Sequence, residues 1–346
     1  MLNWFGDYRS LRFLCGYFGG RTFCFRGGEI VNILNEKQHL MFEKEISKKE
    51  YEDRKKDFLD TYYDLREKVD NSFLGKLSIK QHKNLHWLAY SLICLKSKFS
   101  GFSYEILKSK PEKSDKPIIF AVTHIGKFDI EILNWAIKWH SYILTGDFER
   151  LQGTVDGTFC DLNGAVYFNE RVKEDRISAS ERMIKVLKSG TNLMFFPEGA
   201  WNLSPNQPMN PCYWGIIDVA KKGNAVILPI AIEQYGKHFK IAFGDYLKVF
   251  NYEDKSIAIN TLRDEMATLK WLIWETEFTS RSDISESYWK KYVAERLAEW
   301  SGFTEEYING LVFKPKGITE PTEAYAHLET LSSNPYNAFL FNKRLH

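Results

Sequence analysis

Residues 118–129 read Ile-Ile-Phe-Ala-Val-Thr-His-Ile-Gly-Lys-Phe-Asp. The first five are apolar and β-prone, as in a buried strand, and the polar residues after them mark the loop that follows it. Residues 193–199 repeat this pattern as Leu-Met-Phe-Phe-Pro-Glu-Gly. Because open α/β sheets bind ligands at the carboxyl ends of their strands, the two stretches predict one shared site.

Further β-prone runs alternate with amphipathic stretches around these two. They occupy residues 143–144, 165–168, 225–232 and 239–243. This alternation predicts an α/β core over residues 103–250, in which capping-box spacing at Ser178 begins a helix that Gly190 ends. Ahead of the core we expect a mainly helical region, residues 1–102. After it we expect packing helices and an irregular tail, residues 251–346.

The composition disfavours several classes of protein. Lys and Arg total 47 against 45 Asp and Glu, so no overall charge favours nucleic acid as a partner. The five cysteines are scattered and never spaced C-x-x-C, so neither a disulfide framework nor a zinc site is indicated, and a reducing cytosol is the expected compartment. No N-terminal stretch has the order of a signal peptide, and no apolar run reaches the roughly 20 residues of a membrane-spanning helix.

The most apolar helical stretch, residues 85–95, has two interpretations. Lysines flank it on both sides, and Trp87 and Tyr90 lie within it. Apolar and aromatic bulk between basic ends suits a helix that lies in the headgroup layer of a membrane. The same pattern fits a core helix with solvated lysine ends.

His124 and Asp129 form the candidate catalytic pair. A histidine held by a carboxylate through one ring nitrogen can accept a proton with the other, because imidazole titrates near neutral pH. If the strand ends near Thr123 and a helix begins near Phe128, the chain can turn back so that the carboxylate meets the ring. The base would then act on a substrate hydroxyl. Such a pair also arises by chance, so alone it is a weak motif.

Glu198 and Gly199 follow the second strand directly. The carboxylate can accept hydrogen bonds from substrate hydroxyls, and a glycine amide can approach an anionic oxygen without obstruction by a side chain. The alternative is a tight turn in which Glu198 is solvated.

Four blocks of the sequence, taken in order, resemble the glycerolipid (lysophosphatidic acid) acyltransferase family. The first is His124-x4-Asp129. The others are Gly-Ala-Val-Tyr-Phe-Asn-Glu-Arg at 164–171, Phe-Pro-Glu-Gly at 196–199 and Ile-Leu-Pro-Ile-Ala-Ile at 227–232. Four blocks in sequence are far less accidental than one. The resemblance covers roughly residues 100–250 and implies a mixed sheet flanked by helices.

The resemblance also implies roles for single residues. His124 would be the general base and Asp129 its orienting partner. Arg171 would contact the acceptor's phosphate, for which the guanidinium fork is suited. Glu198 and Gly199 would belong to the acceptor pocket.

The chain departs from the family pattern in two blocks. The third block continues Ala200-Trp201-Asn202, where the family usually has Thr and Arg, so a hydroxyl and a second cation are missing. Trp201 offers an aromatic face to the acceptor instead, which could then be a less anionic lysolipid, a glycolipid or an amino lipid. In the first block, Lys127 either replaces the missing positive charge or is a solvated lysine at the start of a helix.

The reaction that the resemblance implies is O-acyl transfer. A fatty acyl group would move from an acyl thioester of coenzyme A or acyl carrier protein to a hydroxyl of a lysophospholipid-like acceptor. No metal or further cofactor is expected, since no ligand-spaced residues surround His124. The protein would be cytoplasmic and bound peripherally to the inner face of the membrane. A lipid-binding protein without activity and a thioester hydrolase are the alternatives, although the chain lacks the Gly-x-Ser-x-Gly elbow of serine hydrolases.

Overall fold

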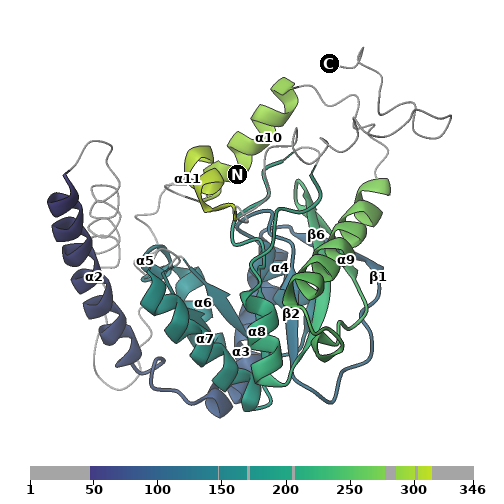
Figure 1. Ribbon diagram of the computed structural model, residues 1–346. Helices are drawn as coiled ribbons and strands as arrows, with labels where there is room; N and C mark the ends of the chain where they lie inside the picture. The colour runs from purple at the N-terminus through teal and green to yellow at the C-terminus, as the bar shows by residue number, and fades with distance from the viewer. Residues whose placement is uncertain are drawn as a thin grey trace, which may run out of the picture.

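A seven-stranded sheet with strand order β1-β7-β6-β2-β5-β3-β4 carries both sequence stretches (Figure 1). Neighbouring strands pair in parallel, except that β7 runs antiparallel to β6. The predicted α/β fold with a mixed sheet is therefore confirmed. The strands are β1 (Ser103–Lys108), β2 (Ile118–Val122), β3 (Ser141–Thr145), β4 (Ala165–Tyr167), β5 (Asn192–Phe195), β6 (Val226–Tyr235) and β7 (His238–Phe243).

The computed structural model describes residues 47–146, 148–169, 172–204, 207–276, 286–300 and 303–313. Its helices are α2 (Lys48–Asp70), α3 (Ile79–Phe99), α4 (Asp129–Ile137), α5 (Phe148–Leu151), α6 (Val155–Asn163), α7 (Lys173–Lys188), α8 (Gly215–Gly223), α9 (Lys255–Glu275), α10 (Glu286–Ala298) and α11 (Glu305–Leu311), with a 3-10 turn η1 (Val249–Asn251). No helix in these ranges is both long enough and apolar enough to cross a bilayer.

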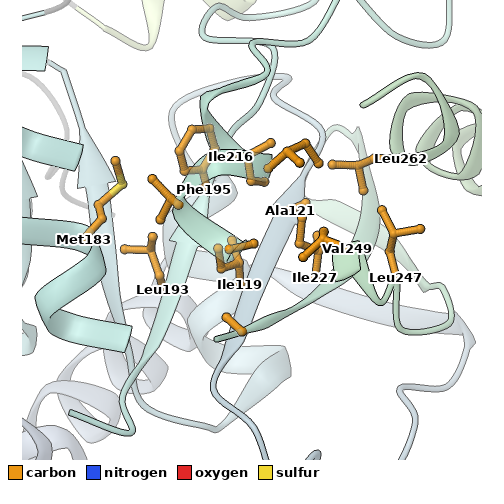
Figure 2. Close-up of a cluster of buried hydrophobic side chains, with 14 of the residues drawn as sticks. Ile119, Ala121, Met183, Leu193, Phe195, Ile216, Ile227, Leu247, Val249 and Leu262 are labelled. Atoms are coloured by element: carbon orange, nitrogen blue, oxygen red, sulfur yellow. The ribbon is translucent and has the colours of Figure 1, made fainter. Parts of the chain in front are cut away.

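Helices cover both faces of the sheet. Alternate residues of β2 point to opposite sides, because side chains alternate along a strand. Ile119 and Ala121 enter a core shared with α7, α8 and α9, which Figure 2 shows in close-up. Phe120 enters the core on the other side, shared with α4. Strand β2 is therefore apolar at every position, as the sequence predicts for a central strand.

The N-terminal helix α2 stands at the β4 side of the sheet (Figure 1). Its Phe58 and Tyr62 pack against Phe148 of α5 and Tyr167 of β4. Helix α3 contacts α4 and α6. It begins earlier and ends later than the apolar stretch 85–95, and it has a capping box at Ser78.

The outer face of α3 bears on both interpretations of its sequence. Ala89 and Ile93 are buried against the protein, whereas Trp87, Leu95 and Phe99 are exposed. The helix is thus packed on one side and presents large apolar side chains on the other.

Two local expectations were wrong. Helix α7 begins at Lys173 with Val172 as its N-cap, so Ser178 lies inside the helix and not at its start. A short helix, α11, occupies residues 305–311, where irregular chain was expected. The helix end near Gly190 is confirmed, since Ser189 is the C-cap of α7. The division of the chain into three regions stays a prediction, and residues 1–46 and 314–346 lie outside the described residues.

Candidate active site

The two sequence motifs lie side by side because their strands are neighbours. Strand β2 pairs with β5 in parallel, with Ala121 opposite Phe195, so the loops after both strands leave the same edge of the sheet. Two hydrogen bonds join these loops at His124. Its backbone N–H donates to Glu198 Oε1 at 3.0 Å, and its carbonyl accepts from the Asn202 N–H at 2.7 Å. The backbone of the candidate base is thereby held from both sides.

Asp129 is the first residue of α4 and organises the loop that carries His124. Its Oδ2 lies 2.8 Å from His124 Nδ1. The same oxygen accepts hydrogen bonds from the backbone N–H groups of Ile125, at 2.8 Å, and Gly126, at 3.1 Å. The carboxylate is fully buried at a helix N-terminus, where the helix dipole favours negative charge. The structure thus brings the predicted pair together.

This arrangement is suited to proton abstraction. A carboxylate can only accept hydrogen bonds, so the neutral ring of His124 carries its proton on Nδ1, and Nε2 keeps a lone pair. The ring lies against Phe196, with 4.3 Å between ring centroids, and meets Trp201 edge-on at 6.1 Å. These contacts fix the ring plane, and His124 lines a cavity.

Glu198 occupies a different place from the one the sequence suggested. Its side chain is fully buried, and its Oε2 accepts a hydrogen bond from the Asn210 N–H at 2.8 Å. Both oxygens therefore bind backbone amides, and the residue supports the loop beneath His124 without contacting the cavity. Burial raises the pKa of Glu198 to about 7, although the two backbone N–H groups work in the opposite direction.

Gly199 also has a structural reason for its identity. Its φ is +68°, and a Cβ there would lie 2.5 Å from Cε2 of Tyr213. Any other residue would be strained and would clash. The N–H of Gly199 donates to the Phe196 carbonyl at 3.1 Å. This amide, considered from sequence for contact with an anionic oxygen, is used within the turn.

Lys127 and Trp201 line the cavity beside His124. Lys127 is partly buried, with Nζ 3.7 Å from Asp156 Oδ2 and 5.3 Å from the ring centroid of Trp300. It is therefore neither a solvated surface lysine nor an unpaired cation. The other cation named from sequence, Arg171, lies outside the described residues.

Sequence reasoning missed the charged wall of the cavity. Glu131, in the first turn of α4, and Asp156 of α6 both line it. Lys96 of α3 bridges them, with Nζ at 2.6 Å from Glu131 Oε2 and 2.8 Å from Asp156 Oδ1. A usable signal existed for Glu131, because a carboxylate within the apolar run Ile130–Leu133 must find a buried partner.

The C-terminal segment supplies the remaining wall. Trp300 and Phe303 line the cavity, and Phe303 packs edge-on against Trp201 at 4.8 Å between centroids. Both residues lie more than 50 positions beyond the last strand, so no local pattern could have linked them to His124. Within the described ranges, no group of three or more His, Cys, Asp or Glu side chains could hold a metal ion.

This chain is similar to known proteins in two ways, one through a family model and one through a solved structure. The family model described as Acyltransferase matches residues 104–233. The chain is also similar to the crystal structure of the 1-acyl-sn-glycerophosphate (LPA) acyltransferase PlsC from Thermotoga maritima, with 12% sequence identity, a TM-score of 0.47, and coverage of 74% of this chain and 98% of that chain. No curated protein matches the chain.

The family match runs from the second residue of β1 almost to the end of β6. It includes the His124 and Asp129 pair, the loop that holds Glu198, and every strand that positions them. The chain therefore contains a domain that matches the acyltransferase family model, and the candidate catalytic pair lies within it.

Proposed function

We propose that the protein is an O-acyltransferase that moves a fatty acyl group from an acyl thioester of coenzyme A or acyl carrier protein to a hydroxyl of a lysolipid acceptor. The contact of 2.8 Å between His124 Nδ1 and Asp129 Oδ2 at the wall of a cavity is the observation that carries the proposal. The family match supports acyl transfer as the reaction class. The donor, the acceptor and the role of each residue are parts of the proposal.

The mechanism uses His124 twice. Its Nε2 accepts the proton of the acceptor hydroxyl while the oxygen attacks the thioester carbonyl carbon. When the tetrahedral intermediate collapses, the carbon–sulfur bond breaks and the imidazolium returns the proton to the leaving thiolate. Asp129 keeps the ring in the right tautomer and stabilises the imidazolium between the two steps. General-base action of this kind typically accelerates a reaction by roughly 10²–10⁴-fold.

A direct test compares two histidine variants of the full chain. Thioester consumption and lipid product are measured with labelled acyl-CoA or acyl carrier protein and a panel of lysolipids. His124→Ala should lower turnover by roughly 10²–10⁴-fold. His238→Ala, which changes a partly exposed histidine of β7, should leave turnover unchanged. Equal turnover by wild type and His124→Ala would refute the proposed base, and no turnover by either would favour a lipid-binding protein.

We also propose that the enzyme meets its lipid substrates at a membrane surface through the outer face of α3. The exposed Trp87, Leu95 and Phe99 on a helix with lysines at both ends support this proposal. The cytoplasmic side of the membrane stays a prediction from the cysteine pattern.

Vesicle sedimentation tests the membrane proposal. With vesicles of phosphatidylethanolamine and phosphatidylglycerol, Trp87→Glu should lower the bound fraction several-fold, because it places a charge on the inserted face. Trp271→Glu makes the same change at an exposed tryptophan of α9 and should bind as wild type does. Equal binding by the two variants would exclude this face of α3 as the contact.

A further inference from the structure

The charged groups at the cavity wall are paired with one another. Lys127 faces Asp156 at 3.7 Å. Lys96 contacts Asp156 at 2.8 Å and Glu131 at 2.6 Å. The second oxygen of Glu131 accepts a hydrogen bond from Ser97 Oγ at 2.6 Å. Two cations and two carboxylates thus form one network beside His124, and their formal charges cancel.

Lys96 and Lys127, the cations of this network, are each paired with a carboxylate. Burial alone would lower the pKa of Lys96, but Asp156 and Glu131 outweigh it and raise the net value. Lys96 is therefore held as a cation by partners that it already has. On the side of α10, Glu299 pairs with Arg296 at 3.0 Å and adds no free positive charge.

Apart from His124 and Thr145, the rest of the cavity wall is apolar and largely aromatic. Its aromatic side chains are Phe128, Phe159, Trp201, Trp300 and Phe303, and the wall also includes isoleucine and leucine side chains. Among the lining residues that the structure describes, Lys127 is the only cation. A phosphate monoester in this cavity would meet two carboxylates and one shared lysine, whereas phosphate sites in proteins present several unpaired donors or cations.

We infer that the acceptor presents an uncharged, hydroxyl-bearing group to this wall and no phosphate monoester. The inference rests on the proposed function and names the substrate class of the same site. A neutral alcohol leaves the ion pairs intact. Its remaining hydroxyls find carboxylate acceptors, of which Asp156 is the more accessible. The aromatic side chains cover its apolar part.

The test uses two acceptors that differ only in the phosphate. Monoacylglycerol and lysophosphatidic acid with the same acyl chain are offered to the full-length protein with acyl-CoA, at equal mole fraction in micelles of a neutral detergent. The value of kcat/KM for monoacylglycerol should exceed that for lysophosphatidic acid by about 10-fold or more. This ratio is measured on the wild-type protein and needs no variant that must fold.

Variants that change one charge then test whether the cavity wall causes the preference for monoacylglycerol over lysophosphatidic acid. Asp156→Asn removes one negative charge with little change in shape, and it should move the ratio several-fold toward lysophosphatidic acid. Asp218→Asn, on the surface of α8 at 3.4 Å from Lys255, should leave the ratio unchanged. A ratio that is the same in all three proteins would overturn the assignment of selectivity to this wall.

The remaining outcomes separate this inference from the proposed function. Equal rates, or a preference for lysophosphatidic acid that Arg171→Ala abolishes, would overturn the inference and return the acceptor to the glycerophosphates while His124-dependent transfer stands. Transfer only to a phosphodiester lysolipid, such as lysophosphatidylethanolamine, would overturn it in the same way. No His124-dependent turnover with any acceptor would refute the proposed function and the inference with it.

Discussion

Asp129 serves the active site through a single oxygen atom. Its Oδ2 accepts hydrogen bonds from the His124 ring and from two backbone N–H groups. The orientation of the base and the shape of its loop therefore depend on the same negative charge. Removing that charge should disturb catalysis and folding together.

Asp129→Asn tests this dependence. The neutral amide oxygen can occupy the Oδ2 position but is a weaker acceptor than the carboxylate, and the NH2 group then replaces Oδ1, which is buried without a hydrogen-bond partner among the described residues. A buried donor left unsatisfied in this way costs about 1–3 kcal/mol. We expect a loss of transfer activity of about 10²-fold or more and a lower melting temperature. Asp245→Asn, at a highly exposed aspartate, should change neither quantity. Full activity in Asp129→Asn would show that the charge is dispensable.

Glu198 should make the stability of the fold depend on pH. Burial raises its pKa from 4.5 to about 7, so between these values the native state binds more protons than the unfolded state. The free energy of unfolding then falls as the pH rises through this window and is level above it. Between pH 5 and pH 8 the contribution of this one group is about 2–3 kcal/mol.

The variant Glu198→Gln removes this titration. It should be less stable than wild type at pH 5, because one backbone N–H loses its acceptor, and the difference in the free energy of unfolding should narrow toward pH 8. Urea denaturation of both proteins at pH 5 and at pH 8 measures this difference. A constant difference between wild type and variant would contradict a raised pKa.

At the scale of single residues, the sequence predicted the pairing of His124 with Asp129 but not the buried position of Glu198, which holds the loop beneath them. The pairing of His124 with Asp129 could be predicted because the strand, the turn and the start of the helix that bring them together are adjacent in the sequence. The burial of Glu198 is not readable, because Asn210, which captures one of its oxygens, comes from a loop that only the folded sheet brings near. The same holds for Lys96, which reaches Asp156 across 60 residues.

At the scale of elements, apolar strands were easy to find and exposed ones were not. Strand β1 has no buried residue, and its sequence therefore lacks the continuous apolar run that marks β2 and β5. Helix α7 starts early for a tertiary reason. Asp175 in its first turn accepts hydrogen bonds from Tyr62 of α2 and from the Asn169 backbone. Tyr62 and Asp175 are 113 residues apart in the sequence, so a local sequence pattern could not have indicated this start of α7.

A histidine cluster beneath α3 should make the docking of that helix sensitive to acid. The ring of His86 in α3 packs against His140, and His82 of the same helix and His140 both contact the ring of Tyr142. The Nε2 atom of His140 lies 2.8 Å from the Asn163 carbonyl. Burial lowers the pKa of His140 to about 4. Below pH 6.5 the unfolded state therefore binds the extra proton, and the free energy of unfolding falls as the pH falls.

His140→Gln keeps a donor for the Asn163 carbonyl and removes the titration. Between pH 7.5 and pH 5 the wild type should lose about 2 kcal/mol that the variant does not lose. His238→Gln, at a partly exposed histidine, should follow the wild type. The titration of Glu198 changes the free energy of unfolding with pH in the opposite direction to that of His140. Each variant is therefore compared with wild type at every pH, because the wild-type curve itself is not constant. Parallel curves for His140→Gln and wild type would rule out this group.

At the scale of the whole molecule, the segment after α9 belongs to the site although it lies beyond the matched domain. Helices α10 and α11 lie above the sheet in Figure 1. Ile308 of α11 is almost fully buried and packs in one cluster with Trp201, Trp300 and Phe303. The wall of the cavity therefore depends on the packing of a short helix.

Ile308→Ala should test this dependence. Loss of a buried isoleucine side chain costs about 2–5 kcal/mol, and we expect the KM for the acceptor to rise more than kcat falls, because the change loosens the wall and leaves His124 in place. Ile257→Ala, at an exposed position of α9, should alter neither stability nor KM. A large loss of kcat at an unchanged KM would argue against the segment as a substrate wall.

The position of β1 at the edge of the sheet has a consequence during synthesis. This strand leaves the ribosome long before β7, its partner among the described strands, because Ser103 pairs with His238, 135 residues further along the chain. At translation rates of about 5–20 residues per second, the nascent strand waits roughly 7–27 s with unpaired amides. An open edge of this kind can recruit strands from other chains. Slow translation or crowded polysomes should therefore lower the yield of native protein before any substrate is met.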